Sequence, residues 1–287
     1  MPSNVDAIVY SKDFFKYFTN QLQVEPDGAV WYVSQFSQYE MEVRELGVFH
    51  TIFSREDPEI KSVFDMIERY SLFDFDESLP TTQRLPSKSI MINRDELTKV
   101  FYASADESFH GSFLELEQSL MQLQTRLVEY PFAVLNVKLS LLKKDFKPGE
   151  ECEIRFEFSN RGQAKVAFVN PKYTGESAKG HLSIELWNCN SDERGNSTEE
   201  FALSVNCTEY ELLTAPRIAL PSDKMILEIG SGERIYASFR FPFPKLENGK
   251  YIAFSIYKSL IADQTKIKNL LMGELHTDLQ ELLVHSK

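Results

Sequence analysis

The chain has 287 residues, of which 43% are hydrophobic and 26% charged, a composition typical of a soluble globular protein with one or two domains. No apolar run approaches the roughly 18 residues that a membrane-spanning helix needs. The first residues also lack the basic start and apolar core of a signal peptide, so we expect a cytoplasmic protein without membrane insertion.

The first 131 residues mix helix and strand signals and predict an acidic α+β domain, residues 1–131. Residues 10–18 are rich in Phe and Tyr and fit either a short helix or an irregular strand. Pro26-Asp27-Gly28 lies between two apolar runs, which is typical of a β-hairpin. The order β-β-β-α-β-β-α predicts an antiparallel sheet with two helices on one face. After the first hairpin, the predicted elements are a strand at 39–49, a helix at 59–70 with Ser54 as its N-cap, a hairpin around Asn93-Arg94-Asp95 and a helix at 112–129.

Beyond Tyr130-Pro131 almost every segment alternates apolar and polar residues, so residues 132–287 are predicted to form an all-β sandwich domain. Turns are expected at Lys147-Pro148-Gly149-Glu150, Asn160-Arg161-Gly162 and Gly230-Ser231-Gly232. Strands are expected at 134–142, 154–158, 166–169, 182–187, 225–229, 235–241 and 251–257.

Two segments of this second half have weaker patterns. Residues 188–200 are polar and rich in Asn and Ser, and they predict a loop. Residues 259–287 fit either a helix with a leucine stripe or a closing strand near 279–284. We favour the strand, because a sandwich needs a final strand beside residues 251–257.

The turn motifs of the second half carry a resemblance to a bacterial immunoglobulin-like β-sandwich. They are Lys147-Pro148-Gly149-Glu150, Asn160-Arg161-Gly162, Gly230-Ser231-Gly232-Glu233 and Asn248-Gly249-Lys250-Tyr251. The first half resembles a small α+β bacterial domain family of unknown function in its Pro26-Asp27-Gly28 hairpin and its two helices. Both resemblances imply a fold and bring no catalytic residues.

The sequence offers little for catalysis or metal binding. Cys152, Cys189 and Cys207 form no CxxC pair, and the carboxylates beside Cys152 are expected to raise the pKa of its thiol. No two histidines have metal-ligand spacing, so we predict no catalytic residue, no metal and no cofactor. His110 is the most site-like histidine, and an enzyme centred on it, oriented by Asp106 or Glu107, is an alternative that ranks below a structural role.

Charge is the strongest indication of function. Residues 1–131 hold 11 basic and 22 acidic residues, a net charge of −11 within a chain total of −12. This acidity disfavours nucleic acid and favours fast, salt-sensitive docking of a basic protein. The alternative reading of the charge is solubility alone.

We therefore expect a non-enzymatic protein-binding module, such as an inhibitor or immunity-type protein that neutralises a basic partner. A structural or envelope-associated protein is the alternative, and the sequence leaves the oligomeric state open. Aromatic side chains crowd the first forty residues, where they either fill the core or form a patch with nearby acidic residues; Tyr and Trp are favoured interface anchors. The candidate binding residues are Trp31, Tyr32, Tyr39, Glu40, Glu42, Asp74, Asp76 and Glu77.

Overall fold

The computed structural model describes most of the chain and divides it into two compact units. The first unit is Met1–Phe36 with Gly47–Val134, and the second is Ser37–Leu46 with Leu135–Lys287. The predicted domain boundary between residues 131 and 132 stays a prediction. The described residues are 5–14, 18–37, 44–75, 87–104, 108–109, 111–173, 178–191, 197–207, 212–213, 224–261 and 269–285.

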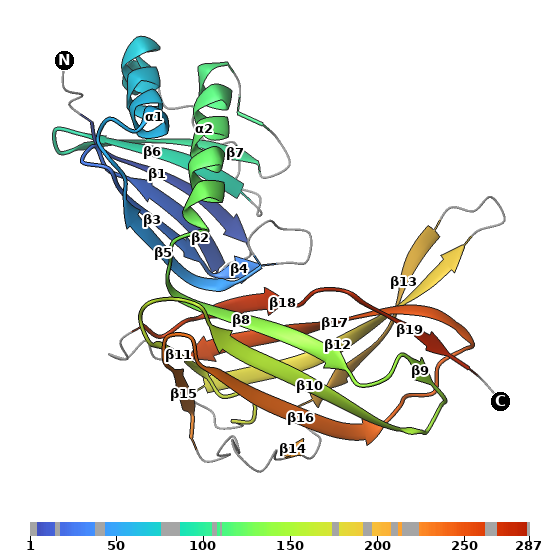
Figure 1. The fold of residues 1–287 in the computed structure, drawn as a ribbon. Helices are drawn as coiled ribbons and strands as arrows, with labels where there is room; N and C mark the ends of the chain where they lie inside the picture. Colours follow the sequence, from blue (N-terminus) through green and yellow to red (C-terminus); the bar gives the residue numbers. More distant parts are fainter. Residues whose placement is uncertain are drawn as a thin grey trace. The chain divides into compact units, whose positions relative to one another are not determined.

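The first unit is built on an antiparallel sheet in the order β5-β3-β2-β1-β6-β7, with both α-helices on one face (Figure 1). Tyr10 pairs with Leu22, Leu22 with Tyr32 and Tyr32 with Phe49 on neighbouring strands. These four residues therefore lie side by side on the helix-covered face of the sheet. The strands up to this point are β1 (Val5–Phe14), β2 (Phe18–Val24), β3 (Ala29–Ser34), β4 (Phe36–Ser37), β5 (Leu46–Ile52), β6 (Ser87–Arg94) and β7 (Leu97–Ser104).

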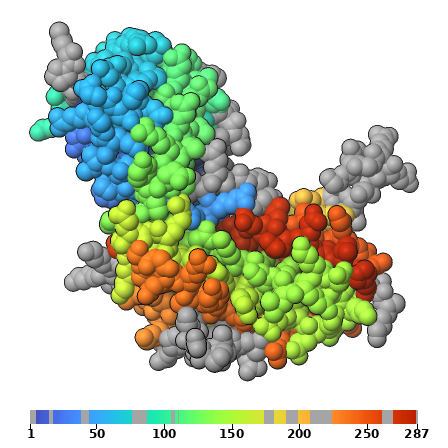
Figure 2. Space-filling model, in the orientation of Figure 1, coloured from blue at the N-terminus to red at the C-terminus, as the bar shows by residue number. Residues whose placement is uncertain are grey.

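The helices α1 (Pro58–Arg69) and α2 (Ser112–Leu127) each bury one apolar stripe, as their sequence periodicity predicts. The two helices pack against each other and form one continuous layer in Figure 2. A 3-10 turn, η1 (Leu72–Asp74), follows α1. The buried stripes are Ile60, Val63, Phe64 and Ile67 in α1 and Leu116, Leu120, Leu123 and Leu127 in α2.

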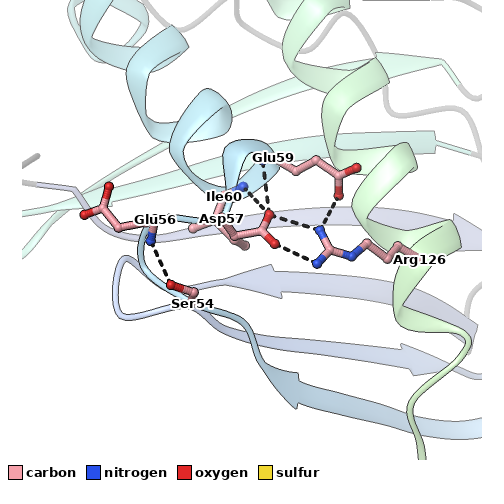
Figure 3. Close-up of polar contacts among 6 residues, drawn as sticks. All are labelled: Ser54, Glu56, Asp57, Glu59, Ile60 and Arg126. Atoms are coloured by element: carbon pink, nitrogen blue, oxygen red, sulfur yellow. Dashed lines mark hydrogen bonds and ion pairs between the residues drawn. The ribbon is translucent and has the colours of Figure 1, made fainter.

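The N-terminus of α1 is capped by Asp57 rather than by Ser54, so the predicted N-cap is wrong. The carboxylate of Asp57 accepts hydrogen bonds from the backbone N–H groups of Glu59 and Ile60 at 3.1 and 3.5 Å. Pro58 follows at the first helical position, where its fixed φ fits and its missing N–H costs nothing. Arg126 of α2 reaches across and pairs with Asp57 at 2.6 Å and Glu59 at 3.0 Å, which ties the two helices together (Figure 3).

The second unit consists of sheets that face each other. One has the order β14-β16-β10-β8, and in the other β12, β18 and β19 pair with β17. Phe158 of β10 packs edge-on against Tyr257 of β17, with ring centroids 5.4 Å apart, so the core lies between the sheets. The strands are β8 (Pro131–Leu141), β9 (Asp145–Phe146), β10 (Glu151–Asn160), β11 (Val166–Val169), β12 (Ala178–Ser191), β13 (Ser197–Asn206), β14 (Leu212–Leu213), β15 (Ile226–Ile229), β16 (Arg234–Pro242), β17 (Gly249–Ile261), β18 (Gly273–His276) and β19 (Gln280–Val284).

The predicted fold class, an α+β domain followed by an immunoglobulin-like sandwich, is wrong: the chain is mostly β, with large multi-stranded sheets. The described part of residues 10–18 belongs to strands β1 and β2, because its side chains alternate between the two faces of the sheet. Residues expected in a polar loop after 187 instead extend β12 and begin β13. The chain does close with the strand β19, as favoured from the sequence.

Candidate functional site

The face of the first unit's sheet that the helices leave uncovered carries the candidate binding site. Successive residues of a strand point to opposite faces, so Tyr32 lies under the helices and Trp31 on the other side, here called the helix-free face. In the register, Trp31 lies between Gln23 of β2 and His50 of β5. The Trp31 cluster is defined as Gln23, Glu25, Trp31, His50 and Phe132.

Stacked aromatic rings form the centre of the Trp31 cluster. The rings of Trp31 and His50 lie nearly parallel, with centroids 3.4 Å apart and an interplanar angle of 18°. Phe132 presents its edge to both rings, at 6.3 Å from each. The backbone N–H of His50 donates to the Tyr130 carbonyl at 3.0 Å, which fixes the strand that carries the imidazole. Because Trp31 and His50 are both half-buried, the stack keeps part of its surface accessible.

A carboxylate adds charge to this aromatic stack. Glu25 follows β2, and the amide of Gln23 donates to its Oε1 at 2.8 Å. Burial lowers the pKa of His50 below its usual value, while the negative charge of Glu25 opposes that shift. His50 is therefore neutral at pH 7, and Glu25 supplies the negative charge of the cluster. An aromatic surface beside a carboxylate suits a cationic side chain, which both groups attract.

The remainder of the helix-free face holds uncharged polar and apolar side chains along with Asp13. Gln21 donates to the hydroxyl of Ser11 at 3.3 Å, and Thr19 donates to Asp13 at 2.7 Å. Half-buried apolar side chains on this face are Val33, Val48, Met91, Val100 and Tyr102.

The structure separates the candidate residues predicted from the sequence. Trp31 lies on the helix-free face, whereas Tyr32 is buried among the helices and burial raises the pKa of its hydroxyl. Asp74 is exposed at the end of η1. Tyr39, Glu40, Glu42, Asp76 and Glu77 lie outside the described residues, as do Asp106, Glu107 and His110 of the alternative catalytic site.

Sequence reasoning missed Glu25, His50 and Phe132 as neighbours of Trp31. The pairing of Gln23 with Trp31 follows from a three-residue turn, Pro26-Asp27-Gly28, whereas a two-residue Asp27-Gly28 turn would place Gln23 opposite Tyr32. His50 belongs to a strand placed further along the chain, and no local pattern specifies which residue of β5 meets Trp31.

The cysteines of the protein are poor nucleophiles. Burial raises the pKa of both Cys152 and Cys207 to about 12, and Cys189 also has a raised pKa, again chiefly through burial. For Cys152 the direction agrees with the sequence prediction, but the adjacent carboxylates contribute less than burial does. Within the described ranges, no three His, Cys, Asp or Glu side chains are grouped to hold a metal ion.

A second titratable cluster lies in the second unit, on β17 and β18. His276 Nε2 lies 2.8 Å from Glu274 Oε1, and Lys258 Nζ lies 2.8 Å from Glu274 Oε2. Burial raises the pKa of Glu274, but the hydrogen bonds from His276 and Lys258 outweigh it, so the net shift is downward. One oxygen of Glu274 is engaged by His276 of the same strand, and the other by Lys258 of β17. The pair with Lys258 links the two strands, so this cluster is best explained as a structural contact that holds β18 against β17.

Comparisons with known proteins identify no family. No family model and no curated protein matches the chain. In the described part of the chain, no helix combines the length and apolarity needed to cross a membrane.

Partial similarities exist among solved structures. Spo0M, a sporulation control protein of Bacillus subtilis, is 16% identical with a TM-score of 0.31, over 53% of this chain and 50% of that one. AvmM, which catalyses macrocyclization in alchivemycin A biosynthesis, is 14% identical with a TM-score of 0.31, over 53% of this chain and 89% of that one. The CARDB domain of a Pyrococcus furiosus protein is 9% identical with a TM-score of 0.26, over 55% and 98%. The chain spans half the length of Spo0M. TM-scores this low support no conclusion about fold or function.

Proposed function

We propose that this protein is a non-enzymatic binding module for a basic protein partner, and that the Trp31 cluster is part of its contact surface. The observation that carries the proposal is the half-buried stack of Trp31 on His50 with Glu25 beside it, on a sheet face that the helices leave uncovered. Tryptophan is among the residues that contribute most to binding energy at interfaces.

The charge of the chain supports a basic partner. The first 131 residues carry a net charge of −11, whereas residues 132–287 carry 20 basic and 21 acidic residues. Opposite charge on two partners speeds their encounter, and added salt weakens this effect because the Debye length falls to about 8 Å at physiological ionic strength. Binding by this protein is therefore expected to be faster at low salt.

The experiment is affinity capture from a lysate of the source organism, at low and at high salt, with Trp31→Ala as the test variant. We expect the unmodified protein to retain a basic protein at low salt and Trp31→Ala to lose most of it. Phe201→Ala is the matched control, since Phe201 is an exposed aromatic residue of the second unit, 53% accessible. Capture of only acidic proteins, or equal capture by the Trp31→Ala variant, would contradict the proposal.

We propose further that binding neutralises the partner, as an inhibitor or immunity-type protein does. The captured protein supplies the assay: its activity is measured with increasing amounts of the unmodified protein and of Trp31→Ala. Inhibition by the first and weaker inhibition by the second is the expected result. Full activity of the partner at saturating amounts of the unmodified protein would refute the inhibitory role and leave the binding role intact.

A further inference from the structure

Strand β7 forms one edge of the first unit's sheet. It pairs with β6 along its whole length, from Ser87 opposite Ser104 to Arg94 opposite Leu97, without a bulge. Within the described ranges no strand pairs with its other side. An unpaired edge presents a row of N–H and C=O groups that an extended segment of another chain can bind.

The hairpin geometry identifies the groups that face outward. Asp95 and Glu96 form a two-residue turn, and both have positive φ, 47° and 66°. In such a hairpin the residues that flank the turn form a hydrogen-bonded pair, and bonded and non-bonded pairs then alternate along the ladder. Leu97, Lys99 and Phe101 therefore direct their backbone groups toward β6. Thr98, Val100, Tyr102 and Ser104 direct theirs toward the free side.

Among the described residues, β7 itself carries neither the row of charges nor the bulge that usually protects an edge, as a comparison with β13 shows. Strand β13 also ends its sheet, but it carries the exposed Glu199 and Glu200, and its register with β12 is irregular. Charges and bulges of this kind prevent unwanted pairing. In β7 the one charged residue is Lys99, whose ammonium group donates to the Phe75 carbonyl at 2.9 Å. The rest of β7 is rich in residues that favour strands, among them Val100, Phe101 and Tyr102.

Charge indicates what kind of strand this edge accepts. The exposed Asp95 and Glu96 lie at one end of β7, and the first 131 residues have a net charge of −11. A second copy of the chain would bring the same negative charge to the contact, whereas a lysine- or arginine-rich segment complements it. We propose that an extended basic segment of the partner adds to β7 as a further strand. This inference rests on the proposed function, because it specifies how the basic partner binds.

Hydrogen exchange of backbone amides tests the inference directly, with a synthetic peptide of alternating lysine and valine, as long as the eight residues of β7, as the probe. In the protein alone, the amides of Val100 and Tyr102 should exchange much faster than that of Phe101. The peptide should slow exchange at Val100 and Tyr102 by about tenfold or more. Amides that are already protected without peptide, or that the peptide leaves unprotected, would overturn the inference.

A pair of variants separates backbone pairing from side-chain contact. Val100→Pro removes one outward N–H that the β6–β7 ladder does not use, which edge strands tolerate. Val100→Ala keeps that N–H and shortens the side chain. We expect the proline variant to lose peptide binding at least about tenfold and the alanine variant to keep most of it. Equal loss of peptide binding in both variants would overturn pairing through the backbone. The hydrogen-exchange measurement uses the unmodified protein, so it tests the inference even if a variant fails to fold.

Three further outcomes distinguish this inference from the proposed function. A glutamate–valine peptide that protects β7 equally well would overturn the charge preference. Protection that rises with protein concentration in the absence of peptide would identify a second copy as the occupant and overturn the inference. If a basic protein is captured through Trp31 but β7 stays unprotected in that complex, only the strand addition fails and the proposed function stands.

Discussion

The ammonium group of Lys88 and the carboxylate of Glu117 meet inside the first unit at 2.7 Å, with side chains only 8% and 6% accessible. The hydroxyl of Tyr10 donates to the same carboxylate oxygen at 2.9 Å, and the ammonium also lies 5.3 Å from the centre of the Phe109 ring. Burial, together with the charge of Glu117, raises the pKa of Tyr10, so its hydroxyl stays protonated. These bonds join β6 and β1 to α2 within a layer that is mostly apolar and also buries Asn20 and Ser34.

Replacing one member of this buried pair is expected to destabilise the protein strongly. Lys88→Met leaves the carboxylate of Glu117 buried without its counter-charge, which typically costs about 3–5 kcal/mol of unfolding free energy. Urea denaturation at pH 7, followed by tryptophan fluorescence, measures the change.

The double variant Lys88→Met, Glu117→Leu is the matched control. It removes both charges and replaces them with side chains of similar volume, but it also takes the acceptor from the buried Tyr10 hydroxyl, so it should recover only part of the stability that Lys88→Met loses. The triple variant that adds Tyr10→Phe removes the unpaired hydroxyl as well. If it is as unstable as Lys88→Met, uncompensated charge does not explain the loss.

The pairing of Asp57 with Arg126 predicts a pH-dependent contribution to stability. The hydrogen bond from Arg126 lowers the pKa of Asp57 below its usual 3.8, despite opposition from burial. A lowered pKa in the folded state gives stability that is fully present above pH 3.8 and is lost as the pH falls through the folded value. Asp57→Asn keeps a capping oxygen and removes the ion pair, and it should cost up to about 1 kcal/mol at pH 7, since Arg126 is partly exposed.

Asp57→Ala separates the cap from the ion pair. It removes both, so it should cost about 1 kcal/mol more than Asp57→Asn at pH 7. Thermal unfolding of the three proteins between pH 7 and about pH 3 checks this. A difference between the unmodified protein and Asp57→Asn that stays constant over this range would disprove the pH dependence.

The Trp31–His50 stack predicts pH dependence in a higher range. Burial lowers the pKa of His50 below 6.5, so the unfolded chain takes up this proton more readily than the folded one. The stability due to neutral His50 is therefore present above pH 6.5 and declines as the pH falls toward the folded pKa. His50→Phe retains a ring beside Trp31 and does not titrate, so its stability should fall less between pH 7 and about pH 5. An NMR titration that places the pKa of His50 above 6.5 would contradict this.

Local patterns predicted the parts of the fold that depend on neighbours in the chain. The Asp27-Gly28 turn formed where expected, with Gly28 at φ 95° and a backbone approach that leaves no room for a Cβ beside the Phe53 carbonyl. The helices begin and end within a few residues of the predicted bounds because their apolar stripes repeat every three or four residues.

Patterns that depend on distant pairing were not predictable in the same way. Asn188 and Cys189 pair with Glu200 and Glu199 in the β12–β13 hairpin, but the polar composition of this segment gives no apolar alternation to reveal a strand. The candidate site has the same limitation. Trp31 was identified by its residue type, whereas the stacking of His50 upon it depends on the pairing of β3 with β5, which no local signal specifies.

Two predicted turns of the second unit meet through Asn160, which is 1% accessible. Its amide nitrogen donates to the carbonyls of Ala164, Ile229 and Gly230 at 2.8, 3.2 and 3.2 Å, and its amide oxygen accepts from the Gly162 N–H at 2.8 Å. Each turn was expected from its own sequence, but the side chain that joins them was not.

Asn160→Asp should destabilise the second unit more than Asn160→Ala. Alanine leaves buried carbonyls with fewer donors, at a cost of about 2–3 kcal/mol. A carboxylate in their place faces the same carbonyls with an uncompensated negative charge, so the aspartate variant should lose more at pH 7 and regain part of the loss as the pH falls and the carboxyl group is protonated. Ser231→Ala, an exposed position in the adjoining turn, is the control and should stay within about 0.5 kcal/mol of the unmodified protein. Urea denaturation at pH 7 and pH 5 measures all three, and an aspartate variant as stable as the alanine variant at pH 7 would rule out the hydrogen-bonding role assigned to the amide.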